Sequence, residues 1–252
     1  MAWILDLDGV VWLGERPIPG AAAGVTELRA AGHRVLFVTN NSSVRLADQE
    51  AKLAAHGIPA AGDLVTSAQA TATLLSPGEV VLVCGGPGLV EAVESRGATP
   101  VRDGPADVVV VGFTRDFDYE LLRAAAGAVR AGARLLASND DATYPTPEGP
   151  IPGGGAILAA VQTGAGTDAI VAGKPYQPMA DLVLARVGDG DTSHTMVGDR
   201  PDTDGRFARV LGARWALVLS GVTTSADGAT PDPDVVAPDL AALVAAERAG
   251  GR

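Results

Sequence analysis

The chain has 252 residues, a length that suits one large domain or two smaller ones. Its formal net charge is −11 and no basic cluster stands out, which argues against a broad nucleic-acid-binding face. The single cysteine, Cys84, excludes an intrachain disulfide, and no apolar run reaches membrane-spanning length. Because no leader pattern precedes the first strand-like run, we expect a soluble cytoplasmic protein that binds neither nucleic acid nor membrane.

Apolar, β-branched runs alternate with helix-like stretches along the chain. The pattern predicts strands within 3–12 and over 33–41, 80–84, 107–113, 134–138 and 169–173, and helices over 20–31, 45–57, 87–96 and 118–131. Toward the C-terminus, the stretches 181–188, 194–199 and 215–221 resemble the first part of the chain again. This alternation predicts an α/β fold, with parallel sheets covered by helices.

The pattern breaks at Ser76-Pro77-Gly78, where a second set of strands and helices begins. We therefore predict a catalytic core made of residues 1–77 and 174–252, with a smaller α/β domain, residues 78–173, inserted into it. The Pro- and Gly-rich loop 139–155 of the insert has the composition of a lid.

Polar side chains follow the predicted strands, and ligands of open parallel sheets bind beyond the carboxyl ends of the strands. The first strand ends in Asp6-Leu7-Asp8-Gly9, a spacing that places two carboxylates on one side of an extended backbone. Two carboxylates this close repel one another, so a cation beside them is expected. The alternative is a pair of acids in a surface turn.

Two further strand ends offer groups that bind anions. Thr39 and Asn40 lie between a buried strand and a helix, although simple helix capping by the neighbouring polar residues also explains them. Lys174 follows the strand predicted over 169–173. It is either a cation that binds a phosphoryl group or a lysine exposed to solvent. The stretch is not a P-loop, because Asp168 and Pro175 stand where that motif needs Gly and Ser or Thr.

A fourth strand end, Val197 to Asp204, carries three acids. Asp199 is best placed as a ligand of a hard cation such as Mg²⁺, and Asp204 as a water-bound or supporting partner. The alternative is an acidic helix N-terminus, where Asp is favourable by itself. Together the four strand ends supply two carboxylates, an anion-binding hydroxyl, a cation and metal ligands. Such a set suits phosphoryl transfer, which depends on positioning and charge neutralisation.

In these stretches the sequence resembles the haloacid dehalogenase superfamily of phosphatases. DLDGV, TNNS, GKP and VGDRPDTD are similar to its four motifs, and the insert resembles its larger α/β cap on a Rossmann-like core. DGVVWLGERPIPGA, TYPTPEG and LSGVTT bring the chain closer to the branch of 4-nitrophenylphosphatase, phosphoglycolate phosphatase and glycerol-3-phosphate phosphatase. The resemblance implies a small phosphorylated metabolite as substrate, with glycerol 3-phosphate or phosphoglycolate favoured, and it leaves a homodimer through the cap open.

The resemblance also implies the roles of individual residues. Asp6 is the nucleophile that becomes an aspartyl phosphate, and Asp8 is the general acid and base. Thr39, Asn40 and Lys174 hold the phosphoryl oxygens. Mg²⁺ is held by Asp6, the Asp8 carbonyl and Asp199, and Asp204 supports these ligands.

Two positions depart from the family pattern, and other functions stay open. Gly205 follows Asp204 where an aliphatic residue is usual, and Asp140 stands where relatives often have Pro. A nucleotide or sugar phosphate phosphatase of the same fold is one alternative, and a phosphometabolite-binding protein without turnover is another. A nucleotide-binding oxidoreductase is disfavoured, because Glu91 occupies the place of the last glycine that a G-x-G-x-x-G pattern needs after Gly86 and Gly88.

Overall fold

The computed structural model describes residues 1–144, 146, 149–188 and 193–250. The chain divides into two compact units. The first unit contains residues 1–39, 50–65 and 180–252, and the second contains residues 40–49 and 66–179. Residues 40–49, 66–77 and 174–179 thus belong to the second unit, whereas the predicted core includes them. The boundaries 1–77/174–252 and 78–173 stay a prediction of the domain organisation.

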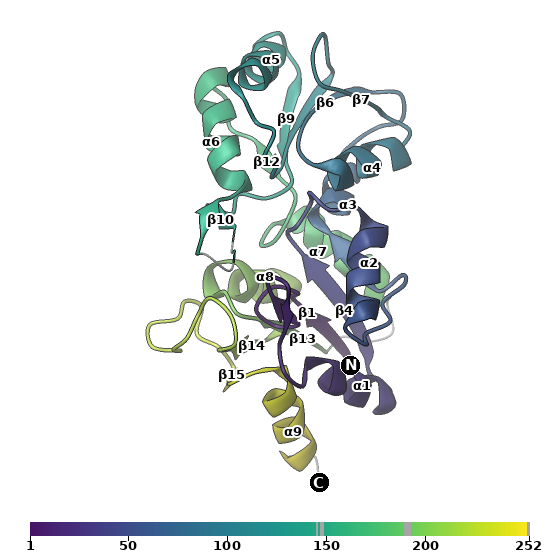
Figure 1. Ribbon diagram of the computed structural model, residues 1–252, viewed down its shortest axis with the longest axis vertical. Helices are drawn as coiled ribbons and strands as arrows, with labels where there is room; N and C mark the ends of the chain where they lie inside the picture. The colour runs from purple at the N-terminus through teal and green to yellow at the C-terminus, as the bar shows by residue number, and fades with distance from the viewer. Residues whose placement is uncertain (145, 147–148, 189–192, 251–252) are drawn as a thin grey trace. The chain divides into compact units, whose positions relative to one another are not determined.

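A six-stranded sheet forms the centre of the first unit (Figure 1), in the order β15-β14-β13-β1-β4-β5. Its strands are β1 (Ala2–Leu5), β4 (Arg34–Thr39), β5 (Leu64–Thr66), β13 (His194–Gly198), β14 (Arg214–Val218) and β15 (Val235–Ala237). β1 runs parallel to both β4 and β13, with Leu5 opposite Phe37 and Val197. This register brings the carboxyl ends of three neighbouring strands to one edge of the sheet.

Helices and one hairpin complete the first unit. α1 (Ala21–Ala30) packs against α9 (Leu240–Gly250), and a π-helical turn (Pro201–Gly205) leads into α8 (Arg206–Leu211). β2 (Trp12–Leu13) and β3 (Arg16–Pro17) form a short antiparallel hairpin. Two helices, α2 (Leu46–Ala55) and α7 (Gln177–Val187), contain residues of both units.

The second unit contains a five-stranded parallel sheet in the order β12-β9-β8-β6-β7. Its strands are β6 (Val80–Cys84), β7 (Thr99–Val101), β8 (Val108–Val111), β9 (Arg134–Ala137) and β12 (Ile170–Val171). On one face the sheet buries alternate side chains against α5 (Tyr119–Arg130) and α6 (Gly154–Ala165). The side chains on the opposite face of this sheet pack against residues of α3 (Ser67–Ala72) and α4 (Pro87–Ser95). A two-stranded sheet joins β10 (Thr143–Tyr144) and β11 (Ile151–Pro152).

The α/β class with parallel sheets is confirmed. The sequence-based expectation misses α6, because the glycines at 153–155 predict a turn and the structure instead begins the helix there. A Cβ on Gly155 would lie 2.3 Å from the carbonyl oxygen of Asp140, so glycine lets the preceding loop approach the helix. Of the predicted lid loop 139–155, residues 145, 147 and 148 lie outside the described residues, and so does part of TYPTPEG.

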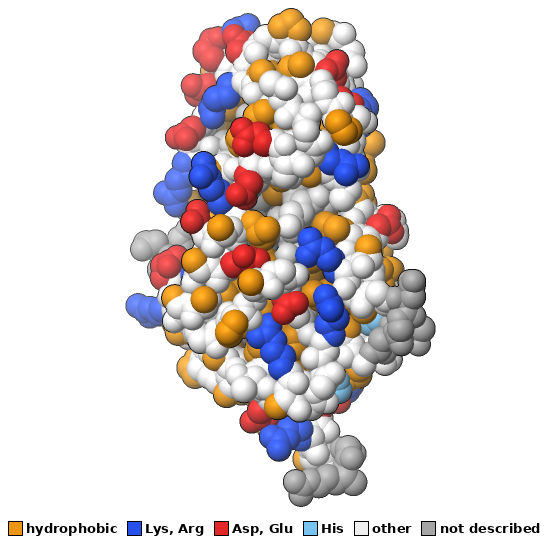
Figure 2. Space-filling view, turned by 90° about the vertical axis from the view of Figure 1, so that its right-hand side faces the viewer, with side chains coloured by type: hydrophobic (Ala, Val, Ile, Leu, Met, Phe, Trp, Pro, Cys, Tyr) orange, Lys and Arg blue, Asp and Glu red, His pale blue; other side chains and the backbone are white. Residues whose placement is uncertain are grey.

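Two further observations concern membrane spans and the distribution of surface charge. None of the described helices combines the length and the apolar character that a membrane span requires. On the face that Figure 2 shows, acidic and basic side chains are interspersed rather than gathered in one basic patch.

Candidate active site

Three neighbouring strands of the first unit bring three of the predicted site residues to one edge of its sheet. Asp6 directly follows β1, Asp199 directly follows β13, and Thr39 is the last residue of β4. The backbone N–H of Asp6 donates to the carbonyl of Val197 at 2.9 Å, which extends the parallel ladder by one residue. The sheet therefore fixes the backbone position from which the Asp6 side chain extends.

Asp6, Asp199 and Asp204 form a buried carboxylate cluster. One oxygen from each lies within 4.8 Å of the others. Three buried carboxylates this close repel one another, and burial without a counter-charge is costly. Ligand oxygens lie about 2.0–2.6 Å from Mg²⁺ or Ca²⁺, so oxygens separated by up to about 5 Å can share one ion. The donor set and its spacing therefore fit a hard divalent cation.

Glycines form a tight enclosure around two of these carboxylates. A Cβ on Gly9, which has a φ of +85°, would lie 2.4 Å from Cγ of Asp199, and one on Gly221 would lie 2.0 Å from its Oδ2. A Cβ on Gly198 would lie 2.3 Å from Cγ of Asp204. Since no side chain fits at these three positions, the backbone itself sets where the carboxylates lie.

Asp8 lies two residues beyond Asp6 and is held by a different contact. The indole Nε1–H of Trp12 donates to Oδ1 of Asp8 at 3.1 Å. The backbone N–H of Gly9 donates to the carbonyl of Trp12 at 2.7 Å and closes the turn. The second carboxylate therefore has its own local support.

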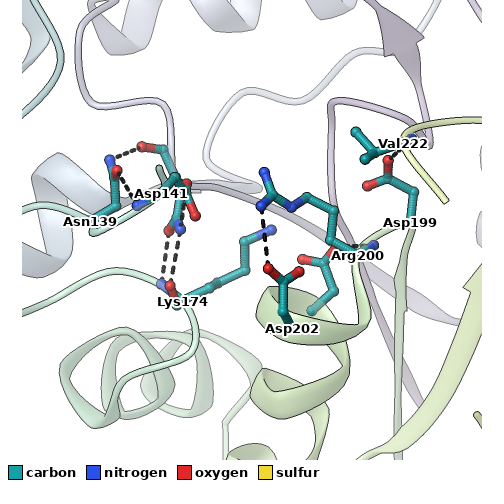
Figure 3. A network of polar contacts seen from close by, with 9 residues as sticks. Asn139, Asp141, Lys174, Asp199, Arg200, Asp202 and Val222 are labelled. Atoms are coloured by element: carbon teal, nitrogen blue, oxygen red, sulfur yellow. Dashed lines mark hydrogen bonds and ion pairs between the residues drawn. The ribbon is translucent and has the colours of Figure 1, made fainter. Parts of the chain in front are cut away.

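In the second unit, the backbone of Lys174, which Figure 3 labels, binds the side-chain amide of Asn40. The backbone N–H of Lys174 donates to Oδ1 of Asn40 at 2.8 Å, and Nδ2 of Asn40 donates to the Lys174 carbonyl at 3.0 Å. Nδ2 also donates to Oδ2 of Asp141 at 3.0 Å. The structure thus brings Asn40 and Lys174 together, with the Asn40 amide directed at Lys174 and Asp141.

The main chain of Asn40 adds two more contacts. Its carbonyl accepts from Oγ of Ser67 and from Nδ2 of Asn139, both at 2.8 Å. A Cβ on Gly173 would lie 2.6 Å from Oδ1 of Asn40, so the glycine before Lys174 is needed for this approach. Asn40 therefore joins residues that follow β9 and β12 in one network within the second unit.

The two departures from the family pattern have structural explanations. A Cβ on Gly205 would lie 3.1 Å from the indole of Trp215, so glycine gives this buried ring its room. Asp140 accepts a short hydrogen bond from the Tyr176 hydroxyl. Neither departure removes a predicted site residue.

A cysteine nucleophile is disfavoured by the environment of the single thiol. Burial raises the pKa of Cys84 to about 12. The thiolate is the reactive form, so this side chain is inert near neutral pH.

The sequence placed the acids at strand ends but missed the residues that hold them. Gly198, Gly221 and Trp12 lie within predicted motifs, yet their positions in the sequence do not indicate a supporting role. A fifth strand end, after β14, is a signal of the same kind as the other four. There Oγ of Ser220 donates to the carbonyl of Gly9 at 2.7 Å, and the N–H of Val222 donates to Asp199.

The chain matches two family models and several known proteins over most of its length. Residues 3–99 match the family model described as haloacid dehalogenase-like hydrolase, and residues 171–243 match a second, HAD-hydrolase-like model. A D-glycerol 3-phosphate phosphatase of Mycobacterium tuberculosis is 40% identical over 238 residues, which are 91% of this chain and 66% of that protein. The chain therefore spans about two thirds of the length of that relative. An acid sugar phosphatase of Staphylococcus saprophyticus is 36% identical over 88% of both proteins.

Solved structures give the same result. A p-nitrophenyl phosphatase from Archaeoglobus fulgidus superimposes with a TM-score of 0.91 at 32% identity, covering 97% of this chain and 98% of that one. A glycerol phosphate phosphatase from Mycobacterium tuberculosis in complex with magnesium gives 0.88 at 38% identity, covering 96% and 75%.

Proposed function

Because the chain belongs to the haloacid dehalogenase-like hydrolases, we propose that it is a Mg²⁺-dependent phosphatase that hydrolyses a small phosphomonoester through an aspartyl phosphate on Asp6. The observation that carries this proposal is the buried cluster of Asp6, Asp199 and Asp204 at the carboxyl edge of β1 and β13. Asp8, two residues further on, supplies a second carboxylate with separate support from Trp12.

The residues of the chain account for both halves of the reaction. The Asp6 carboxylate attacks phosphorus and the bond from phosphorus to the leaving oxygen breaks, while Asp8 gives that oxygen its proton. Asp8 then takes a proton from the water that attacks the phosphoenzyme, and phosphate departs with Asp6 restored. Thr39, Asn40 and Lys174 hold the phosphoryl oxygens, and the side-chain amide of Asn40 also holds the backbone of Lys174.

The metal site follows from the donor set. Asp6, Asp199 and the carbonyl of Asp8 would hold Mg²⁺, with Asp204 in support. When bound, the ion neutralises negative charge on the carboxylates and the phosphoryl group. A relative whose structure contains magnesium supports this choice of ion.

For the substrate, we favour glycerol 3-phosphate over phosphoglycolate. Two relatives, from Mycobacterium tuberculosis and Gallus gallus, carry the name glycerol-3-phosphate phosphatase, which supports this choice. The acid sugar phosphatases among the relatives favour a sugar phosphate as the second candidate.

The test is phosphate release from glycerol 3-phosphate, phosphoglycolate, sugar and nucleotide phosphates and 4-nitrophenyl phosphate, with Mg²⁺ and with EDTA. Asp6→Asn should abolish release. Asp202→Asn is the matched control, because this carboxylate lies in the chain between the cluster members Asp199 and Asp204 and its side chain is 69% exposed. Full activity of Asp6→Asn, or undiminished activity in EDTA, would overturn the proposal. Ligand binding without release from any ester would instead support a binding protein.

A further inference from the structure

The hairpin β2–β3 begins at Trp12, four residues after Asp8, and its buried indole contacts the Asp8 carboxylate. Trp12 is only 4% exposed, and its Nε1–H donates to Oδ1 of Asp8 at 3.1 Å. Residues 8 and 12 are also joined by a backbone bridge. The indole is therefore fixed against the carboxylate by the main chain as well as by its own N–H.

Lys52 of α2 contacts the face of the Trp12 ring and the turn between β2 and β3. Its Nζ lies 4.5 Å from the centre of the Trp12 ring, donates to the carbonyl of Gly14 at 2.9 Å and pairs with Glu15 at 3.1 Å. A cation over an indole face is attracted by the ring and draws electron density from it, which strengthens the N–H as a donor. The ring of His56 packs 5.9 Å from the same indole. Helix α2 thus supports both the hairpin and its indole.

We propose that Trp12 and Lys52 are positioning residues for the proton transfer by Asp8: the indole N–H holds the carboxylate in one orientation, and Lys52 holds the indole. This inference rests on the proposed function, in which Asp8 protonates the leaving oxygen. A general acid must lie within about 2.6–3.2 Å of the atom that it protonates, so a carboxylate that rotates away loses its effect. Nothing in the role of Asp6 as nucleophile depends on this contact.

Trp12→Phe tests the proposal, because phenylalanine keeps an aromatic ring beneath Lys52 and removes the indole N–H. It also removes part of the buried ring volume, a loss that the control variant shares. The measured quantity is kcat/KM for two esters. 4-Nitrophenolate leaves without a proton, whereas the alkoxide of an alkyl phosphate such as glycerol 3-phosphate needs one. We expect Trp12→Phe to lose about tenfold or more on the alkyl ester and under about threefold on 4-nitrophenyl phosphate, since general acid catalysis contributes about 10²–10⁴-fold in full.

Trp3→Phe is the matched control. Trp3 is buried in β1, and its Nε1 has no hydrogen-bond partner among the described residues, so the same substitution removes no bond there. The ratio of kcat/KM between the two esters should stay at the wild-type value. Lys52→Met keeps the alkyl stem and removes the charge; it should change the ratio in the same direction as Trp12→Phe, by a smaller factor.

The outcomes separate this inference from the proposed function. Retained activity in Asp6→Asn would overturn the proposed function. If Asp6→Asn is inactive, a wild-type ester ratio in Trp12→Phe, or an equal loss on both esters, would overturn the positioning role. Thermal melts report whether each variant folds. Should Trp12→Phe fail to fold, the ester ratio of Lys52→Met decides, and an unchanged ratio there contradicts the proposal.

Discussion

Gly221→Ala should displace Asp199 and weaken metal binding. The added Cβ would lie 2.0 Å from Oδ2 of Asp199, 2.5 Å from its Cγ and 2.6 Å from Cα of Gly9. All three distances are below 3.0 Å, which real Cβ atoms essentially never show. Gly9 is backbone with a positive φ and cannot easily yield, so the carboxylate has to move.

The size of the effect follows from two contributions. Overfilling a packed region costs about 1–3 kcal/mol of the free energy of unfolding. Disturbing the support of a metal ligand typically lowers metal affinity or activity about 10–100-fold. That range corresponds to about 1.4–2.7 kcal/mol of binding free energy. We therefore expect Gly221→Ala to fold, to have a lower free energy of unfolding than the wild type, and to require a higher Mg²⁺ concentration for activity.

The assay is the Mg²⁺ concentration that gives half-maximal phosphate release, measured beside a thermal melt. Gly127→Ala is the matched control, because Gly127 lies inside α5 and no atom lies within 4 Å of an added Cβ. Alanine there should leave the Mg²⁺ dependence unchanged and stabilise the helix by about 0.5–1 kcal/mol. A wild-type Mg²⁺ dependence in Gly221→Ala would refute the idea that glycines fix the position of Asp199.

Three further predictions concern the rest of the chain. Asn40→Ala removes both amide contacts to the Lys174 backbone and should raise KM about tenfold in steady-state kinetics, since a typical hydrogen bond contributes about 0.5–1.5 kcal/mol and two are lost. An unchanged KM contradicts the positioning of Lys174. The backbone N–H of Trp215 donates to Asp234 and holds the pKa of this carboxyl below its usual value. The carboxylate therefore stabilises the fold fully above its unfolded pKa of about 3.9, and this stabilisation is lost as the pH falls through the lower pKa of the folded state. Asp234→Asn should cost about 1 kcal/mol in urea unfolding at neutral pH and progressively less in acid, and a pH-independent cost contradicts this origin. Because its pKa is raised to about 12, Cys84 should resist thiol reagents at pH near 8 until urea unfolds the protein, and labelling of the native protein would disprove its burial.

The strand ends could be predicted from the sequence because local pattern determines them. A buried run followed by Asp6, or by Asp199, predicts both the strand and the side chain at its carboxyl end. The parallel order of β13, β1 and β4 then brings these residues to one edge. The α/β class follows from the same alternation of strands and helices.

The supporting contacts could not be predicted because they join residues that are distant in sequence. Gly221 meets Asp199 only after β14 pairs with β13, and Lys52 meets Trp12 only after α2 packs beside the hairpin. The direction of the Asn40 side chain depends in the same way on Lys174, 134 residues later. Helix α6 was missed because packing against neighbouring backbone outweighs the low helix propensity of its first glycines.

The central claim is that a phosphoryl group passes through Asp6, and acid-quenched single turnovers test it most directly. Asp8→Asn is mixed with 4-nitrophenyl phosphate and Mg²⁺, and mass spectrometry then locates any phosphoryl group on the chain. The variant lacks the base that activates water, so phosphoenzyme should accumulate on Asp6, and the Asp6→Asn, Asp8→Asn double variant should carry none. Nitrophenol release without a modified Asp6, or a phosphoryl group on another residue, would contradict the account.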